Sequence, residues 1–151
     1  MDRVNELYKI AEENGIEVLG FPMPESGSMC IEQGGRYYIG MDNTRHFTRA
    51  EEAARLGHEL GHCLYGGLYT RRTPYDIKER HEVRADRWYI VHAIPEDALT
   101  SMLKAGMDAW EIAERLDTTE EYVRRAYYYY KDVKGGCVGE KENRNRDMER
   151  G

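Results

Sequence analysis

His58-Glu59-Leu60-Gly61-His62 is an H-E-x-x-H segment, and the apolar residues around it are spaced as in a helix. Residues four apart lie one turn apart on the same helical face, so the imidazoles of His58 and His62 can reach one Zn²⁺. Glu59 lies beside them, where its carboxylate can take a proton from a water at the metal. The alternative is a helix whose two histidines merely face solvent or core. The segment predicts a zinc site with its own general base.

The helix that carries this motif begins at a capping box, with Thr48 as N-cap and Glu51 reaching back, and it should run to about Leu64. Gly57 and Gly61 fall on its apolar side and would let a neighbouring element approach closely. The histidines project from a different side. The core-facing arc consists of Ala50, Ala53, Leu56, Leu60 and Leu64.

A tetrahedral zinc site with one open position needs a third protein ligand. A second helix is expected from Asp76 to about Ala93, just before Pro95. Glu82 and Asp86 fall within its apolar arc, where unpartnered carboxylates would be costly. We therefore expect Glu82 to be the third ligand and Asp86 to hold a ligand histidine by its other nitrogen. A carboxylate pair answered by arginines is the alternative. The expected arc consists of Val83, Ala85, Tyr89, Ile90 and Ala93.

The cysteines, Cys30, Cys63 and Cys137, are odd in number and widely spaced. This predicts reduced thiols in the cytosol rather than a disulfide framework. Cys63 directly follows His62, but its helical phase predicts a small buried hydrophobe rather than a ligand. The remaining histidines are expected to be surface or packing residues: His46, His81 and His92.

H-E-L-G-H at 58–62, followed by E-V-R-A-D at 82–86 and by Ile94-Pro95, resembles the pattern of the ImmA/IrrE metallopeptidases. Ser28–Ile31 and Tyr37–Gly40 are similar to the small N-terminal sheet of the mobile-element members. The same Glu-x-x-x-Asp pattern occurs in thermolysin-like gluzincins, where the Glu binds zinc and the Asp supports a histidine. The resemblance extends over almost the whole chain, as far as about residue 134.

The resemblance implies a zinc-dependent endopeptidase that cleaves a helix-turn-helix repressor encoded nearby on a prophage or conjugative element. Glu59 would be the catalytic base, and its presence argues against a purely structural zinc. Two alternatives are a non-catalytic anti-repressor that binds and sequesters its partner, and an IrrE-like stress-response regulator. The sequence does not single out an oxyanion-stabilising residue; the candidates are Tyr65, Tyr69, Tyr75 and His81.

The expected fold class is α+β, with a small antiparallel sheet, an N-terminal helix, the zincin-like HExxH helix and the third-ligand helix. The core should occupy residues 1–94, and a helical, helix-turn-helix-like unit at 95–134 should pack on it. Residues 135–151 read as a disordered charged tail. The expected elements before the HExxH helix are a helix at 2–14, a strand at 16–21, and a hairpin of 29–31 with 36–39 turned by 33–35.

The C-terminal unit should begin with a helix at Pro95 that ends near Gly106, followed by helices at 110–116 and 118–127. Residues 108–134 hold seven acidic and five basic residues. A motif that grips DNA phosphates needs the opposite charge, so we expect packing or protein docking here. The tyrosines at 127–130 point to all sides of a helix, so some should be exposed or contact a partner.

The net charge of −6 argues against a general nucleic-acid binder. The N-terminal residues show no apolar core of a signal peptide, and no apolar run approaches the roughly 20 residues that span a bilayer. We therefore expect a cytoplasmic enzyme whose cofactor is Zn²⁺ and whose partner is the repressor, with neither nucleic-acid nor membrane binding.

Overall fold

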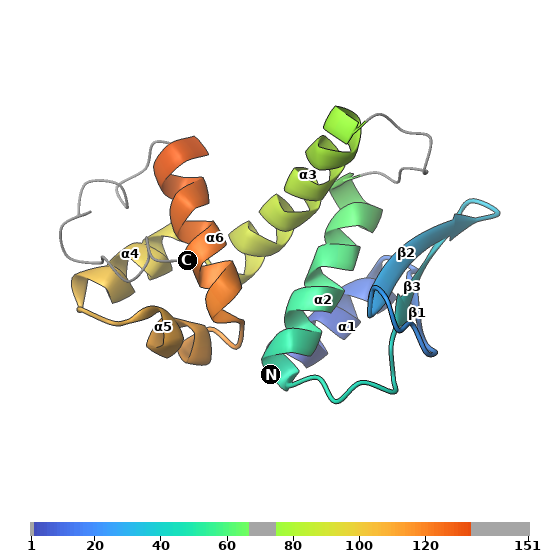
Figure 1. The fold of residues 1–151 in the computed structure, drawn as a ribbon, viewed down its shortest axis with the longest axis horizontal. Coiled ribbons are helices and arrows are strands. Elements are labelled where there is room, and N and C mark those ends of the chain that lie inside the picture. Colours follow the sequence, from blue (N-terminus) through green and yellow to red (C-terminus); the bar gives the residue numbers. More distant parts are fainter. Residues whose placement is uncertain (1, 67–74, 134–151) are drawn as a thin grey trace. The chain divides into compact units, whose positions relative to one another are not determined.

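The computed structural model describes residues 2–66 and 75–133, which form an α+β fold (Figure 1). The chain divides into two compact units, and the division falls between Tyr89 and Ile90. This position lies inside α3 (Tyr75–Ala93), the helix at whose end the sequence predicted the boundary. The tail predicted at 135–151 lies outside the described residues.

The first unit begins with α1 (Arg3–Glu13), which matches the predicted N-terminal helix. Asp2 is its N-cap, and its side chain accepts a hydrogen bond from the backbone N–H of Asn5 at 3.0 Å. Gly15 follows the helix with a φ of 67°, a conformation that glycine adopts without strain. The strands β1 (Glu17–Gly20), β2 (Ser28–Gln33) and β3 (Arg36–Met41) come next.

These three strands form a mixed sheet in the order β1-β3-β2. β2 and β3 are the predicted antiparallel hairpin, and Gly34 and Gly35 in its turn both have positive φ. The prediction of an entirely antiparallel sheet is wrong, because β1 pairs with β3 in parallel. The chain reverses once after β1 and again in the hairpin, so β3 runs in the direction of β1. β3 is also the most buried strand, which suits the central position.

The HExxH motif lies on α2 (Arg49–Gly61), whose predicted N-cap is confirmed: Thr48 accepts from the backbone N–H of Glu51 at 3.1 Å. α2 packs against α1, β2 and β3 (Figure 1). From His62 to Gly66 the chain continues as a π-helical turn, η1. The core of this unit includes fully buried Leu7, Ile39, Leu56 and Leu60.

The close approach expected at the two glycines of α2 is confirmed. A Cβ placed on Gly61 would lie 2.4 Å from the carbonyl oxygen of Ala85, and one on Gly57 would lie 2.0 Å from the ring of Tyr89. The backbones of α2 and α3 therefore meet at Gly61 and Ala85, while the ring of Tyr89 packs on Gly57. Four members of the predicted apolar arc of α3 are buried: Ala85, Tyr89, Ile90 and Ala93. The prediction is wrong at Val83, which is 61% exposed.

The second unit contains α4 (Glu96–Lys104), α5 (Ala109–Arg115), α6 (Glu120–Tyr128) and the π-helical turn η2 (Tyr129–Val133). The predicted helices near 95–106, 110–116 and 118–127 are thus present. The expectation for the tyrosine run is largely wrong, because Tyr127, Tyr129 and Tyr130 are buried and Tyr128 is half-buried. The hydroxyl of Tyr130 donates to the carbonyl oxygen of Ile94 at 2.8 Å, which gives its polar end a partner in the interior.

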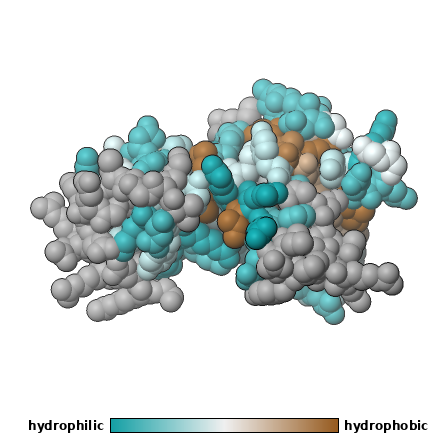
Figure 2. All heavy atoms as spheres, turned by 90° about the horizontal axis from the view of Figure 1, so that it is seen from above, coloured by the Kyte–Doolittle hydropathy of each residue, from teal (hydrophilic) through white to brown (hydrophobic). Residues whose placement is uncertain are grey.

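Several large apolar side chains remain exposed on the small sheet, among them Leu19 of β1 and Met29 and Ile31 of β2. The face drawn in Figure 2 shows hydrophobic residues scattered between hydrophilic ones. None of the helices within residues 2–66 and 75–133 is both long and apolar enough to cross a membrane.

Candidate metal centre

His58 and His62 on α2 converge with Glu82 on α3 to form a group that could hold a metal ion. The two histidine Nε2 atoms lie 3.2 Å apart. Glu82 places one carboxylate oxygen 2.8 Å from Nε2 of His58 and the other 3.0 Å from Nε2 of His62. Ligand atoms ~2.1 Å from a tetrahedral zinc ion lie roughly 3.4 Å from one another. Two imidazole nitrogens and a carboxylate at these separations fit zinc with small adjustments.

Asp86 supports the first of these histidines. Its Oδ1 lies 2.8 Å from Nδ1 of His58, which directs the Nε2 atom of the ring toward Glu82 and His62. A carboxylate on the second nitrogen of a ligand histidine fixes the orientation of the ring and raises its basicity. The geometry therefore matches the position that the sequence predicted for Asp86.

The charge state of His58 reflects these contacts. Burial lowers the pKa of His58, but the hydrogen bonds to Asp86 and Glu82 outweigh it and raise the pKa to about 10. The two carboxylates on either side of the ring thus favour its protonated form. A metal ion that binds Nε2 has to displace that proton, as is general for histidine ligands.

The sequence around the site explains why α3 comes so near. The two glycines of α2, Gly57 and Gly61, each precede a ligand histidine, and both lie against α3. On α3 the contact residues Ala85 and Tyr89 alternate with Glu82 and Asp86 at helical spacing. The glycines that let α2 and α3 pack closely thus lie next to the proposed histidine ligands in the sequence of α2.

The sequence placed the carboxylates of Glu82 and Asp86 within an apolar arc and so predicted that both are buried. In the structure both are partly exposed. The side chain of Glu82 is 40% exposed and that of Asp86 is 24% exposed. They meet the histidines at the rim of the helix pair rather than in the middle of a core face. The group is therefore partly accessible from solvent.

Glu59 is buried beside the two histidines, with 7% of its surface exposed. Burial raises the pKa of Glu59, while the charges of His58 and His62 lower it. The side chain of Ser28, the first residue of β2, lies close enough to Glu59 to lower the pKa of its carboxyl as well. Sequence reasoning missed this contact, because Ser28 precedes Glu59 by about thirty residues and no local pattern links them.

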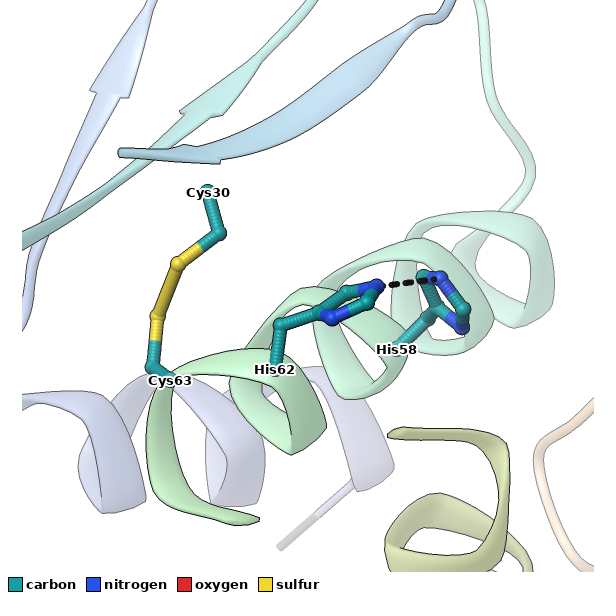
Figure 3. Close-up of a disulfide and its surroundings, with 4 residues drawn as sticks. All are labelled: Cys30, His58, His62 and Cys63. Atoms are coloured by element: carbon teal, nitrogen blue, oxygen red, sulfur yellow. Dashed lines mark hydrogen bonds between the residues drawn. A yellow bond between two sulfur atoms is a disulfide. The ribbon is translucent and has the colours of Figure 1, made fainter. Parts of the chain in front are cut away.

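The prediction of three reduced cysteines is wrong, because Cys30 of β2 and Cys63 of η1 form a disulfide (Figure 3). Cys63 is nearly buried, as its helical phase indicated. The hairpin places Cys30 on the strand face that looks toward α2, so two cysteines 33 residues apart meet across the fold. Cys137 lies outside the described residues.

Of the four candidates for stabilising an oxyanion, Tyr65 is 67% exposed on η1 and His81 is half-buried on α3. Tyr69 lies outside the described residues, as does the side chain of Tyr75. His46 and His92 are not part of the His58–His62–Glu82 group.

In comparisons with known proteins, no protein-family model and no curated protein matched this chain. The resemblance to ImmA/IrrE metallopeptidases therefore rests on the motif residues of the sequence alone.

Proposed function

We propose that this protein is a zinc-dependent endopeptidase that cleaves a helix-turn-helix repressor of a prophage or conjugative element. The observation that carries the proposal is the convergence of His58, His62 and Glu82 within 4.8 Å beside a buried carboxylate, Glu59. Three ligands with one open position are typical of catalytic zinc sites, whereas structural sites are closed by four. A base next to the ligands has a use only in catalysis.

A zinc ion held by these residues would polarise the scissile carbonyl and lower the pKa of a water towards ~7. Glu59 would be placed to accept a proton from the attacking water and to deliver it to the leaving amine. The burial of Glu59, with Ser28 of β2 nearby, limits the room in which its carboxylate can move. Asp86 keeps the His58 ring oriented throughout.

The sheet offers a way to hold an extended peptide. β2 is an edge strand, and its first residue, Ser28, lies close to Glu59. Strand addition at this edge would place a peptide beside the catalytic base. Met29 and Ile31 are each 39% exposed on β2 and are available for apolar side chains of the substrate. The identity of the substrate as a repressor is what the family resemblance implies.

The test compares the parent protein with Glu59→Gln, which keeps the shape of the side chain and leaves the three proposed ligands in place. Each zinc-loaded protein is incubated with the repressor encoded next to its gene, and fragments are resolved by mass. We expect the parent to cut the repressor and the variant to cut it about 10²–10⁴-fold more slowly, because the general base is gone.

Glu51→Gln, an exposed change in the first turn of the same helix, is the matched control and should retain full activity. Zinc content should be equal in all three proteins. The endopeptidase proposal fails if the parent antagonises the repressor in cells without cutting it and Glu59→Gln does so equally well. That outcome would establish a repressor-sequestering protein.

A further inference from the structure

The disulfide lies next to the metal centre and joins two of its parts. Cys63 directly follows the proposed ligand His62, and Cys30 lies two residues from Ser28, which is close to the proposed base Glu59. Residues two apart on a strand share a face, so Ser28 and Cys30 both look toward α2 and η1. Figure 3 shows the disulfide running from the strand that carries Cys30 to the end of the helix that carries His58 and His62.

We propose that the Cys30–Cys63 disulfide is a redox-sensitive switch of the metal centre. In the oxidised form it holds β2 and the His62 turn in the zinc-binding arrangement, and reduction by a low-molecular-weight thiol loosens both. The inference deepens the proposed function, since it adds a regulation of the same site. Its metal-binding part can be measured without any peptidase activity.

The local backbone explains why the bridge matters. α2 changes from α-helix to the π-helical turn η1 at His62, so this ligand lies where the regular hydrogen-bond ladder changes. π-helical turns are rare and often occur at functional sites. A covalent link from the next residue to the sheet fixes this irregular turn. β2 itself is an edge strand that pairs with β3, so the link also fixes the strand beside Glu59.

The two sulfurs differ in accessibility, which sets the order of the reaction. Cys30 is half-buried, while Cys63 is nearly buried. An incoming thiolate attacks Sγ of Cys30, the Cys30–Cys63 bond breaks, and Cys63 leaves as a thiolate that takes up a proton. A second thiol then attacks the mixed disulfide. In total two small thiols are oxidised to their disulfide and the two protein cysteines are reduced.

In a reducing compartment, disulfides are usually transient, catalytic or redox-sensing rather than structural. Because the Cys30–Cys63 disulfide lies beside His62 and Glu59, its reduction by cellular thiols would change the affinity of the site for zinc.

The test uses the full chain carrying Cys137→Ser, so that Cys30 and Cys63 are its only cysteines. Zinc affinity is measured by competition with a chromophoric chelator, first for the oxidised protein. The measurement is repeated after reduction by a phosphine that is removed by desalting without air. We expect reduction to weaken zinc binding by roughly tenfold, the lower range for lost support of a ligand.

Cys30→Ser with Cys63→Ser is the second variant and should bind zinc like the reduced protein, with no further response to reductant. Equal affinity in both redox forms, or an affinity that rises on reduction, overturns the switch. If the repressor is cut equally well by both forms, the switch fails and the endopeptidase stands. If neither form cuts but zinc affinity falls on reduction, the endopeptidase fails and the switch of metal binding stands.

Discussion

Glu82 is the proposed ligand that comes from outside the HExxH helix, so the metal centre depends on how α3 presents it. We expect Glu82→Gln to lose most of its zinc, because a neutral amide is a poor ligand for Zn²⁺ compared with a carboxylate. The parent should carry about one zinc per chain by elemental analysis after dialysis. Glu79→Gln, an exposed change one turn away on α3, should retain the metal. Full retention by Glu82→Gln would mean that the third ligand is a different residue.

Asp86 contacts a ligand histidine and not the ion itself, so its removal should have a graded effect. Asp86→Ala should weaken zinc affinity by roughly 10–100-fold without abolishing binding. Asp86→Asn, whose amide oxygen can still accept from Nδ1 of His58, should recover part of the loss. The measurement is a chelator competition on all three proteins. If Asp86→Ala binds zinc as tightly as the parent, the 2.8 Å contact between Asp86 and His58 does not support metal binding.

At the scale of secondary-structure elements, the site exists because α2 and α3 touch through their backbones. Gly61 lies against the carbonyl oxygen and Cα of Ala85 at distances that no Cβ can accept. A backbone neighbour cannot turn aside as a side chain can, so any residue other than glycine has to separate the two helices. Separation would draw Glu82 and Asp86 away from His58.

Gly61→Ala should therefore lower the free energy of unfolding by about 1–3 kcal/mol, the usual cost of overpacking. Helix propensity alone predicts the opposite sign, since alanine is favoured over glycine in a helix interior by about 1 kcal/mol. Chemical denaturation measures the difference, and the exposed change Glu51→Ala on the same helix is the control. A more stable Gly61→Ala protein would contradict the close approach.

At the scale of the whole molecule, zinc should stabilise the folded chain, because its ligands come together only in the fold. A ligand at a free concentration 100 times its Kd adds about 2.7 kcal/mol, which raises the Tm of a unit of about 90 residues by roughly 11–22 °C. The ligands all belong to the first unit, so the shift should appear in the unfolding transition of that unit.

Thermal scans with and without zinc test this, with Mg²⁺ as the ion control because it prefers oxygen ligands. Glu82→Gln should show little or no shift. An equal shift in the parent and in Glu82→Gln would place the stabilising ion elsewhere on the chain.

The sequence by itself determined those features that depend on residues close together in the chain. The capped helix with its H-E-x-x-H face, the Gly-Gly hairpin and the helices of the second unit all follow from local spacing, and the structure has them. The expectation that Glu82 and Asp86 meet the histidines was also available, because two helical patterns with carboxylates at i and i+4 have few ways to satisfy them. What the site does chemically stays a prediction.

Only the tertiary structure decided the rest. The parallel pairing of β1 with β3 depends on how two chain reversals add up, and the burial of the tyrosine run depends on what surrounds the helix on every side. Ser28 beside Glu59 and the bridge from Cys30 to Cys63 join residues about thirty positions apart. Such contacts arise when a sheet packs on a helix, and no periodicity within either element encodes the partner across the interface.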